Sequence, residues 1–203
     1  EKTIERLFFR EDFRRTPMEE TGEIVFPIHG FELYQNGFLN DINSEAIKKA
    51  NLKIVLDYSY GSSSRIFPPI LGKLNCEVIA LNATIDGGKI TKTAEEFQKS
   101  LNQLSTIVRS LSADIGILLD AGGEKVFLVD DVGEIIDGDA TLSIITLLAL
   151  KRARASGVKG SIAVPVTSSR GIDHLAKTYG FAVKKTKTTS RGLMEAATEE
   201  GVF

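Results

Sequence analysis

Three short apolar runs constrain the fold of this chain more than any other feature. They are "LKIVLD" (52–57), "EVIAL" (77–81) and "DIGILL" (114–119). Each run is apolar at successive positions rather than at alternate ones, so both faces of the strand must be covered. Helices on two sides of a parallel sheet provide that cover. The runs therefore predict three central, parallel strands of an α/β protein.

Helical segments separate these runs. Residues 93–112 repeat apolar side chains at helical spacing, and Thr93 stands where it can cap the first turn. The segment 62–75 carries Pro68 and Pro69, which fit poorly in a helix interior. We therefore expect a short helix there that breaks or restarts at the prolines.

The rest of the chain extends the same alternation. Two strand-like runs joined at 131–133 predict a hairpin at the edge of the sheet. A second α/β unit follows, with Asp139 as the expected N-cap of its first helix. The predicted elements of this unit are a helix over 140–156 ended by Gly157, a strand over 160–166, a helix over 169–179, a strand over 181–186 and a helix over 190–200. The opening residues 1–15 predict a charged amphipathic helix, and 20–43 a linker with one or two short strands.

Composition excludes several classes of protein. The chain has 203 residues, a net charge of -2 and one cysteine, Cys76. A clustered basic surface for nucleic acid is not expected, and the apolar run 140–150 is too short to span a membrane. An internal disulfide is impossible and no Cys/His cluster has metal spacing, so we expect a cytoplasmic protein. The start at Glu1 suggests a piece of a longer polypeptide.

The loop after the third run is the main candidate site. Asp120 follows a buried strand, a position where α/β proteins hold metals, and Gly122 and Gly123 come next. An ordinary hairpin, with Asp120 bonded to turn amides, explains the same residues. The nearby acids do not have the spacing of a calcium loop, and turn and cap roles account for them. They are Asp130, Asp131, Asp137 and Asp139.

Other polar segments have simple structural interpretations. "YGSSSR" (60–65) and "TSSRG" (167–171) precede helices and are interpreted as turns and caps rather than phosphate loops, with Ser168 or Ser169 as the cap of the second. The basic stretch 184–192 is interpreted as a solvated rim. His29 and His174 have no nucleophile or paired carboxylate beside them, so surface or packing roles are expected.

Several phrases in fixed order resemble the phosphohexomutases, the phosphoglucomutase and phosphomannomutase family. They are "LKIVLDYSYGSSSRIFPPILGKLNCEVIALNATIDG", "ADIGILLDAGGEKVFLVDDVGEIIDGDATL" and "GSIAVPVTSSRGIDHLAKTYGFAVKKTKT". The resemblance implies two consecutive three-layer α/β/α domains with mixed, mainly parallel sheets. Residues 1–33 would be an N-terminal helix and linker, 34–138 domain II and 139–203 domain III, which could be incomplete.

The resemblance also implies Mg²⁺ bound by a D-G-D-A-D-R loop, which aligns with residues 120–125. Only Asp120 remains of the three aspartates, Gly122 replaces the second and Glu124 the third, so we expect a degenerate and empty metal site. Lys125 replaces the arginine of the loop, and Lys187 and Arg191 fall in the region near the sugar phosphate. No catalytic residue is assigned, because the family's phosphoserine loop and G-E-x-S-G segment are not found in this chain.

The expected function is that of a non-catalytic mutase-like module. The resemblance suggests attachment to a sugar-1-phosphate nucleotidyltransferase of the mannose-1-phosphate guanylyltransferase type, in nucleotide-sugar metabolism. Two alternatives stay open: the middle domains of an active, Mg²⁺-dependent mutase, and a stand-alone sugar-phosphate-binding or structural module. The expected partners are a hexose phosphate, the remaining domains of the parent polypeptide and a second copy in a homo-oligomer.

Overall fold

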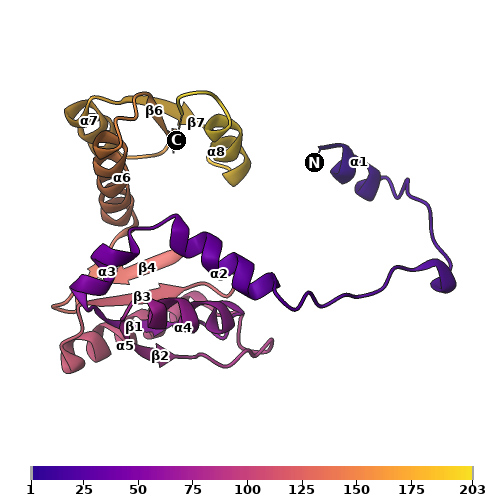
Figure 1. Ribbon diagram of the computed structural model, residues 1–203, viewed down its shortest axis with the longest axis horizontal. Helices are drawn as coiled ribbons and strands as arrows, with labels where there is room; N and C mark the ends of the chain where they lie inside the picture. The colour runs from indigo at the N-terminus through magenta and orange to yellow at the C-terminus, as the bar shows by residue number, and fades with distance from the viewer. Residues whose placement is uncertain (1, 203) are drawn as a thin grey trace. The chain divides into compact units, whose positions relative to one another are not determined.

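The computed structural model describes residues 2–202. Its backbone forms two compact units, which divide between Phe38 and Leu39. Helix α1 (Lys2–Phe9) and the 3-10 turn η1 (Met18–Glu20) precede the division, and α2 (Gly30–Asn40) crosses it (Figure 1).

Two predictions for the N-terminal segment are wrong. The first helix ends at Phe9 rather than near residue 15, and the described residues of the linker 20–43 contain α2 and no strand. The aromatic residues Phe31, Tyr34 and Phe38, a residue type common in strands, recur three and four positions apart. That spacing places them on one face of a helix, and the periodicity outweighs the strand preference of the residue types.

A mixed five-stranded sheet forms the centre of the residues after the division. Its strands are ordered β2 (Glu77–Leu81), β1 (Lys53–Asp57), β3 (Ile115–Leu119), β4 (Val126–Val129) and β5 (Ile135–Ile136). The first three strands are parallel, whereas β4 and β5 are antiparallel to their neighbours. The parallel strands and the edge hairpin are thus confirmed. However, β2 lies at an edge with Glu77 and Ala80 exposed, so it is not central as predicted.

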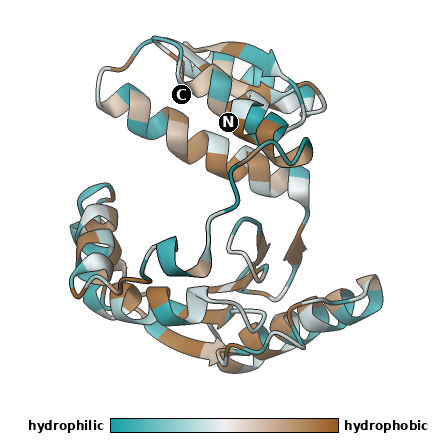
Figure 2. Ribbon diagram, turned by 90° about the vertical axis from the view of Figure 1, so that its right-hand side faces the viewer, coloured by the Kyte–Doolittle hydropathy of each residue, from teal (hydrophilic) through white to brown (hydrophobic). Residues whose placement is uncertain are grey.

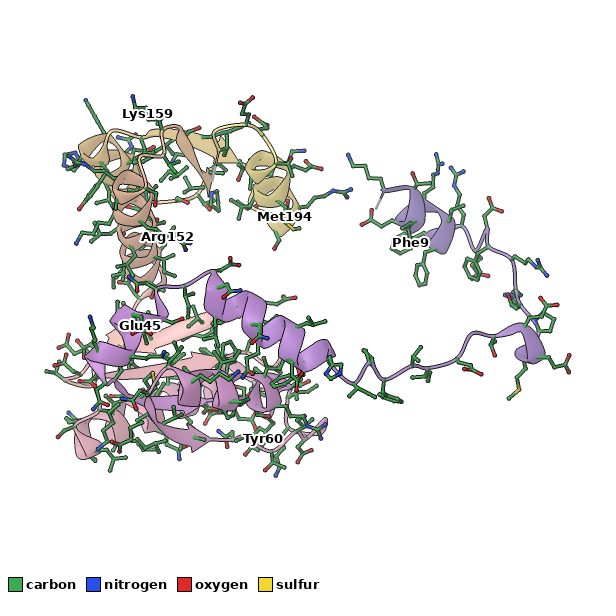
Figure 3. The ribbon with its side chains drawn as sticks, in the orientation of Figure 1. Phe9, Glu45, Tyr60, Arg152, Lys159 and Met194 are labelled. Atoms are coloured by element: carbon green, nitrogen blue, oxygen red, sulfur yellow. The ribbon has the colours of Figure 1, made fainter. Side chains whose placement is uncertain are left out.

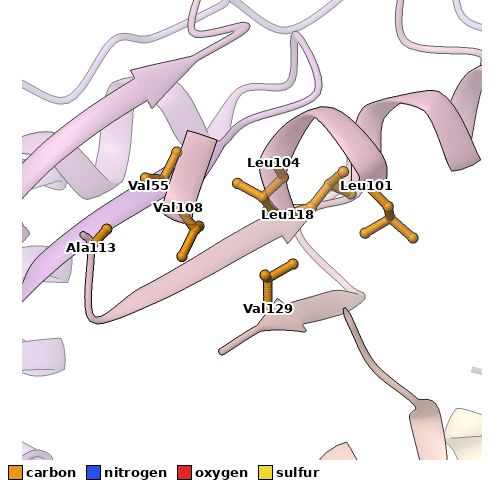
Figure 4. Close-up of a cluster of buried hydrophobic side chains, with 7 residues drawn as sticks. All are labelled: Val55, Leu101, Leu104, Val108, Ala113, Leu118 and Val129. Atoms are coloured by element: carbon orange, nitrogen blue, oxygen red, sulfur yellow. The ribbon is translucent and has the colours of Figure 1, made fainter. Parts of the chain in front are cut away.

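Helices cover both faces of this sheet. Helix α5 (Ala94–Leu111) packs on one face, where its buried leucines and Val108 contact Val55, Leu118 and Val129 (Figure 4). Helix α4 (Ser63–Lys73) packs on the other face, where Phe67 and Leu71 contact the cluster of Ile54, Leu56 and Tyr58. Together with α3 (Ser44–Ala50), which precedes β1, these elements form an α/β/α arrangement. Figure 2 shows hydrophobic and hydrophilic residues sharing most helices, as helices with one covered face require.

The two prolines do not break α4, contrary to prediction. The helix runs without interruption from Ser63 to Lys73. Pro68 and Pro69 are both exposed, and the carbonyls that they leave without an amide partner belong to the first turn and a half of the helix. The apolar side chains on the opposite face hold the helix against the sheet, and this packing outweighs the local cost of the prolines.

The predicted second group of alternating strands and helices contains a two-stranded parallel sheet of β6 (Ser161–Pro165) and β7 (Ala182–Thr186). Helices α6 (Gly138–Ala155) and α7 (Arg170–Tyr179) share a core with it that includes Leu150, Ile162 and Ile172, and α8 (Ser190–Ala197) contacts both strands. No helix within residues 2–202 has the length and hydropathy needed to cross a membrane.

The residues that cap α6 and α7 correct one prediction, the N-cap of α6, and confirm two, both ends of α7. The N-cap of α6 is Asp137, not Asp139: its carboxylate accepts a hydrogen bond from the Ala140 amide at 2.7 Å. Asp139 lies inside the first turn, where a negative charge is also favourable. Ser169 caps α7 as expected, and Gly180 follows it in the left-handed conformation.

Candidate functional site

Two loops leave the five-stranded sheet side by side, at the carboxyl-terminal ends of its strands, because β1 and β3 are parallel neighbours. The first loop follows Asp57 and the second is the 120–125 turn. They touch closely: a Cβ atom on Gly61 would lie 2.3 Å from the Ala121 carbonyl oxygen. Only glycine allows the two backbones to approach in this way.

The 120–125 turn is closed by the carboxylate of Asp120. One carboxylate oxygen, Oδ1, accepts hydrogen bonds from the amides of Glu124 at 2.7 Å and Lys125 at 2.9 Å. The Asp120 amide donates to the Lys125 carbonyl at 3.1 Å, and Gly123 takes a positive φ of 69°. The turn joins the antiparallel strands β3 and β4. The predicted hairpin, with Asp120 bonded to turn amides, is confirmed.

Few metal donors lie at this turn. The second carboxylate oxygen of Asp120 and the exposed side chain of Glu124 are the acidic groups that it offers. Gly122 has no side chain, but a Cβ atom there would lie 4.0 Å from Asp120 Oδ2 and 3.9 Å from Glu124 Cδ. In the part of the chain that the structure describes, no three His, Cys, Asp or Glu side chains are grouped to hold a metal.

A buried carboxylate that the sequence analysis missed organises the first loop. Asp57 is 1% exposed, and it accepts hydrogen bonds from the Ser59 amide at 2.8 Å and the Asn82 side chain at 2.9 Å. Ser59 and Tyr60 both have positive φ angles, a strained conformation for residues with side chains. The signal in the sequence was an acid at the end of a run that is otherwise apolar.

The segment "YGSSSR" forms the predicted turn into α4. The Ser64 amide donates to the Gly61 carbonyl, and Ser62 at the N-cap makes no side-chain cap bond. Ser63 is buried, with its hydroxyl unpartnered in the described residues. This segment therefore supports the loop contact with the 120–125 turn rather than a separate site.

Two of the predicted ligand-binding residues, Lys187 and Arg191, lie close to the start of α8. Thr189 caps this helix by accepting a bond from the Gly192 amide at 3.1 Å, and a Cβ atom on Gly192 would lie 3.1 Å from Lys187 Cβ. The loop thus folds back so that Lys187 and Arg191 occupy one loop–helix junction. Arg191 also pairs with Glu195 at 3.3 Å. Lys125 lies just before β4 of the five-stranded sheet. The three predicted ligand-binding residues therefore do not share one loop or helix.

Asp130 has the turn role expected of it, and His29 and His174 have the surface positions expected of them. Asp130 accepts hydrogen bonds from the Val132 and Glu134 amides and so closes the β4–β5 turn. His29 is exposed, but its Nδ1 lies 3.0 Å from Glu32 Oε2, so a carboxylate stands beside it, contrary to expectation. His174 is exposed on α7. Cys76 is half-buried against the α4 side of the sheet, where burial raises the pKa of its thiol.

The contact between Gly61 and Ala121 gives a direct test of how these loops are held. We expect Gly61→Ala to lower the free energy of unfolding by about 2 kcal/mol or more, because the added methyl meets backbone atoms that cannot rotate away. Denaturant unfolding measures the change. Gly72→Ala in α4, where an added Cβ would meet no atom within 4 Å, is the control and should not destabilise. Equal stability of Gly61→Ala and the natural chain would contradict the packing described.

Comparison with known sequences identifies the family. A family model described as "Phosphoglucomutase/phosphomannomutase, alpha/beta/alpha domain II" matches residues 32–133. A phosphoglucomutase/phosphomannomutase of Thermococcus kodakarensis is 31% identical over 96% of this chain, which spans 42% of that protein. A phosphoglucosamine mutase of Thioalkalivibrio sulfidiphilus is 32% identical over 74% of this chain and 32% of its own length. The chain therefore spans less than half of these relatives.

Solved structures show the same fold. A phosphoglucomutase/phosphomannomutase family protein from Burkholderia thailandensis superposes with a TM-score of 0.72 over 98% of this chain and 41% of its own, at 20% identity. A phosphoglucomutase from Paramecium, parafusin, has a TM-score of 0.58 over 82% of this chain and 31% of its own, at 16% identity. With the family model matching about half of its residues, the chain belongs to the phosphoglucomutase/phosphomannomutase family.

Proposed function

We propose that this chain is a non-catalytic phosphohexomutase-like module of a longer sugar-phosphate enzyme, with residues 34–138 as domain II and 139–203 as domain III. We further propose that it is joined to a sugar-1-phosphate nucleotidyltransferase of the mannose-1-phosphate guanylyltransferase type, in nucleotide-sugar and carbohydrate metabolism. The single observation that carries the non-catalytic part is the bonding of the Asp120 carboxylate to the amides of its own turn.

The donor set at this turn does not fit the Mg²⁺ that the family implies. Mg²⁺ requires near-octahedral oxygen ligands at about 2.1 Å. Oδ1 of Asp120 already accepts two amide protons, and Gly122 supplies no ligand where the family has a second aspartate. Glu124 is one methylene longer than the aspartate that it replaces. Phosphoryl transfer depends on a well-positioned metal, so no catalytic step is assigned to these residues.

Binding of a hexose phosphate requires less than catalysis does. Lys187 and Arg191 lie at one junction, where an ammonium and a guanidinium can both meet a phosphate group. The neighbouring lysines of β7 have carboxylate partners, as Arg191 has in Glu195: Lys184 pairs with Glu199 and Lys185 with Asp173. Lys125 is exposed at the end of the 120–125 turn and would serve as a further phosphate contact on domain II. These charges support a sugar-phosphate ligand for the module.

The alternative is that the chain contains the middle domains of an active mutase. It is favoured by the similarity to proteins described as phosphoglucomutase/phosphomannomutase and phosphoglucosamine mutase. The coding sequence upstream of Glu1 separates the two proposals. An active mutase requires a serine in a T-A-S-H-like loop there, whereas a nucleotidyltransferase requires a glycine-rich nucleotide loop followed by a hexapeptide-repeat β-helix.

Metal titration tests the non-catalytic part of the proposal. We expect calorimetry to detect no Mg²⁺ binding by the natural chain at micromolar concentrations, and a gain of binding in the double variant Gly122→Asp, Glu124→Asp. The gain is expected because an aspartate at position 122 would place a third carboxylate beside those of Asp120 and position 124 without a clash.

A neutral variant controls for effects of the added side chain. Gly122→Asn has the shape of aspartate without its charge, so it should not gain binding of comparable strength. Micromolar Mg²⁺ binding by the natural chain would overturn the proposal and restore the active-mutase alternative.

A second titration tests the ligand. We expect glucose 1-phosphate or mannose 1-phosphate to bind the natural chain, and the double variant Lys187→Ala, Arg191→Ala to bind it at least about tenfold more weakly, because two charge-assisted bonds are removed. Lys177→Ala, an exposed lysine on α7, is the matched control and should leave affinity unchanged. Unchanged affinity in the double variant would exclude this placement of the sugar phosphate.

A further inference from the structure

The outer face of α6 carries an apolar patch that ends in positive charge. Three large apolar side chains, between 39% and 60% exposed, are followed along this face by two exposed cations. These residues recur at the spacing of one helix face and are called the α6 face: Ile144, Ile145, Leu148, Lys151 and Arg152. Leu150 and Ala153, on the opposite side of the helix, are buried. Figure 3 labels Arg152 on α6.

The charge of this region is not balanced by nearby acids. Between Asp139 and Asp173 the chain has no Asp or Glu but has five cations, which are Lys151, Arg152, Arg154, Lys159 and Arg170. Lys151 and Arg152 make no ion pair within residues 2–202. Cations near the end of a helix are favourable by themselves, so their charge alone indicates no partner. A contiguous exposed apolar patch beside them does indicate one.

The segment Met18–Ile28 has the complementary pattern. Its acids come first, at Glu19, Glu20 and Glu23. Four large apolar side chains follow within five positions, with exposed fractions of 81–89%: Ile24, Val25, Phe26 and Ile28. Glu20 pairs with Arg14, but Glu19 and Glu23 make no ion pair in the part of the chain that the structure describes. Residues 21–27 belong to no helix or strand, and Figure 1 shows them stretched out.

The segment and the α6 face also match in length when they run in opposite directions. An extended chain spans about 10 Å from Glu23 to Phe26, at about 3.3 Å per residue. A helix rises by about 10 Å from Ile144 to Lys151, at about 1.5 Å per residue. An antiparallel arrangement therefore sets the acids of the segment against the cations of the α6 face, and the two apolar stretches against each other.

We propose that the segment Met18–Ile28 of one copy docks on the α6 face of a second copy, and that the two copies exchange this contact reciprocally. Each chain carries both surfaces, so a dimer with a two-fold axis makes the contact twice. The opposite charges fix the direction in which the segment lies. The inference is independent of the proposed hexose-phosphate ligand and of any metal at the 120–125 turn.

Light scattering coupled to size-exclusion chromatography tests the dimer. We expect the natural chain to dimerise at micromolar concentrations. Two charge-reversed variants should dimerise at least about tenfold more weakly, because like charges then face each other: Lys151→Glu, Arg152→Glu and Glu19→Lys, Glu23→Lys. An equimolar mixture of these two variants should recover the dimer. In the mixed dimer the acidic α6 face of one variant meets the basic segment of the other, and the second contact keeps its natural charges.

A matched control and an apolar variant complete the test. Lys48→Glu, Lys49→Glu makes the same charge change at two adjacent exposed lysines near the end of α3, and it should dimerise as the natural chain does. Val25→Ser, Phe26→Ser serves if the α6 variant does not fold. It should also weaken the dimer, and both side chains are too exposed for the change to disturb a core.

Several results would overturn the inference. One is a natural chain that stays monomeric, which includes docking of the segment on its own chain. Another is natural dimer affinity in either charge-reversed variant or in Val25→Ser, Phe26→Ser. A mixture of the two charge-reversed variants that stays monomeric, or loss of the dimer in Lys48→Glu, Lys49→Glu, would contradict it equally.

Discussion

The parallel pairing of β1 with β3 determines which loops meet in this protein. It brings the loop after Asp57 and the 120–125 turn to one edge of the sheet, where Gly61 and Ala121 touch. Everything proposed for domain II depends on this edge. The carboxylate of Asp120 closes one loop, and the carboxylate of Asp57 organises the other.

Asp57 and Asp120, at the carboxyl-terminal ends of neighbouring strands, have different structural roles. Asp57 is buried and bonded to Ser59 and Asn82, so it fixes a strained loop. Asp120 is more accessible, yet one of its oxygens is used by two amides of its turn. In a family that implies a metal at this position, such use of Asp120, together with the glycine at 122, supports a binding or structural module over a catalytic one.

Much of the fold could be predicted from the sequence because the apolar runs report burial directly. The strands β1 and β3, the Thr93 cap and the hairpin at 120–125 follow from local residues alone. One prediction failed because longer-range packing decided the outcome: the exposed prolines of α4 are tolerated because the opposite face of the helix is held by the sheet. The strands expected in place of α2 were wrong for a local reason, because the helical spacing of Phe31, Tyr34 and Phe38 is present in the sequence. The role of Asp57 could be predicted only in part: an acid at the end of an apolar run signals it, but Asn82 approaches its carboxylate only in the folded chain.

The central claim is that Asp120 is an element of the turn and not a metal ligand. Titration of the isotope-labelled chain with Mn²⁺, which broadens nearby amide signals, tests it residue by residue. Our account predicts that the amides of residues 122–125 lose intensity no faster than those beside other exposed acids, such as Asp86. Selective loss at 122–125 at micromolar Mn²⁺ would show that the turn still holds a metal and would contradict the account.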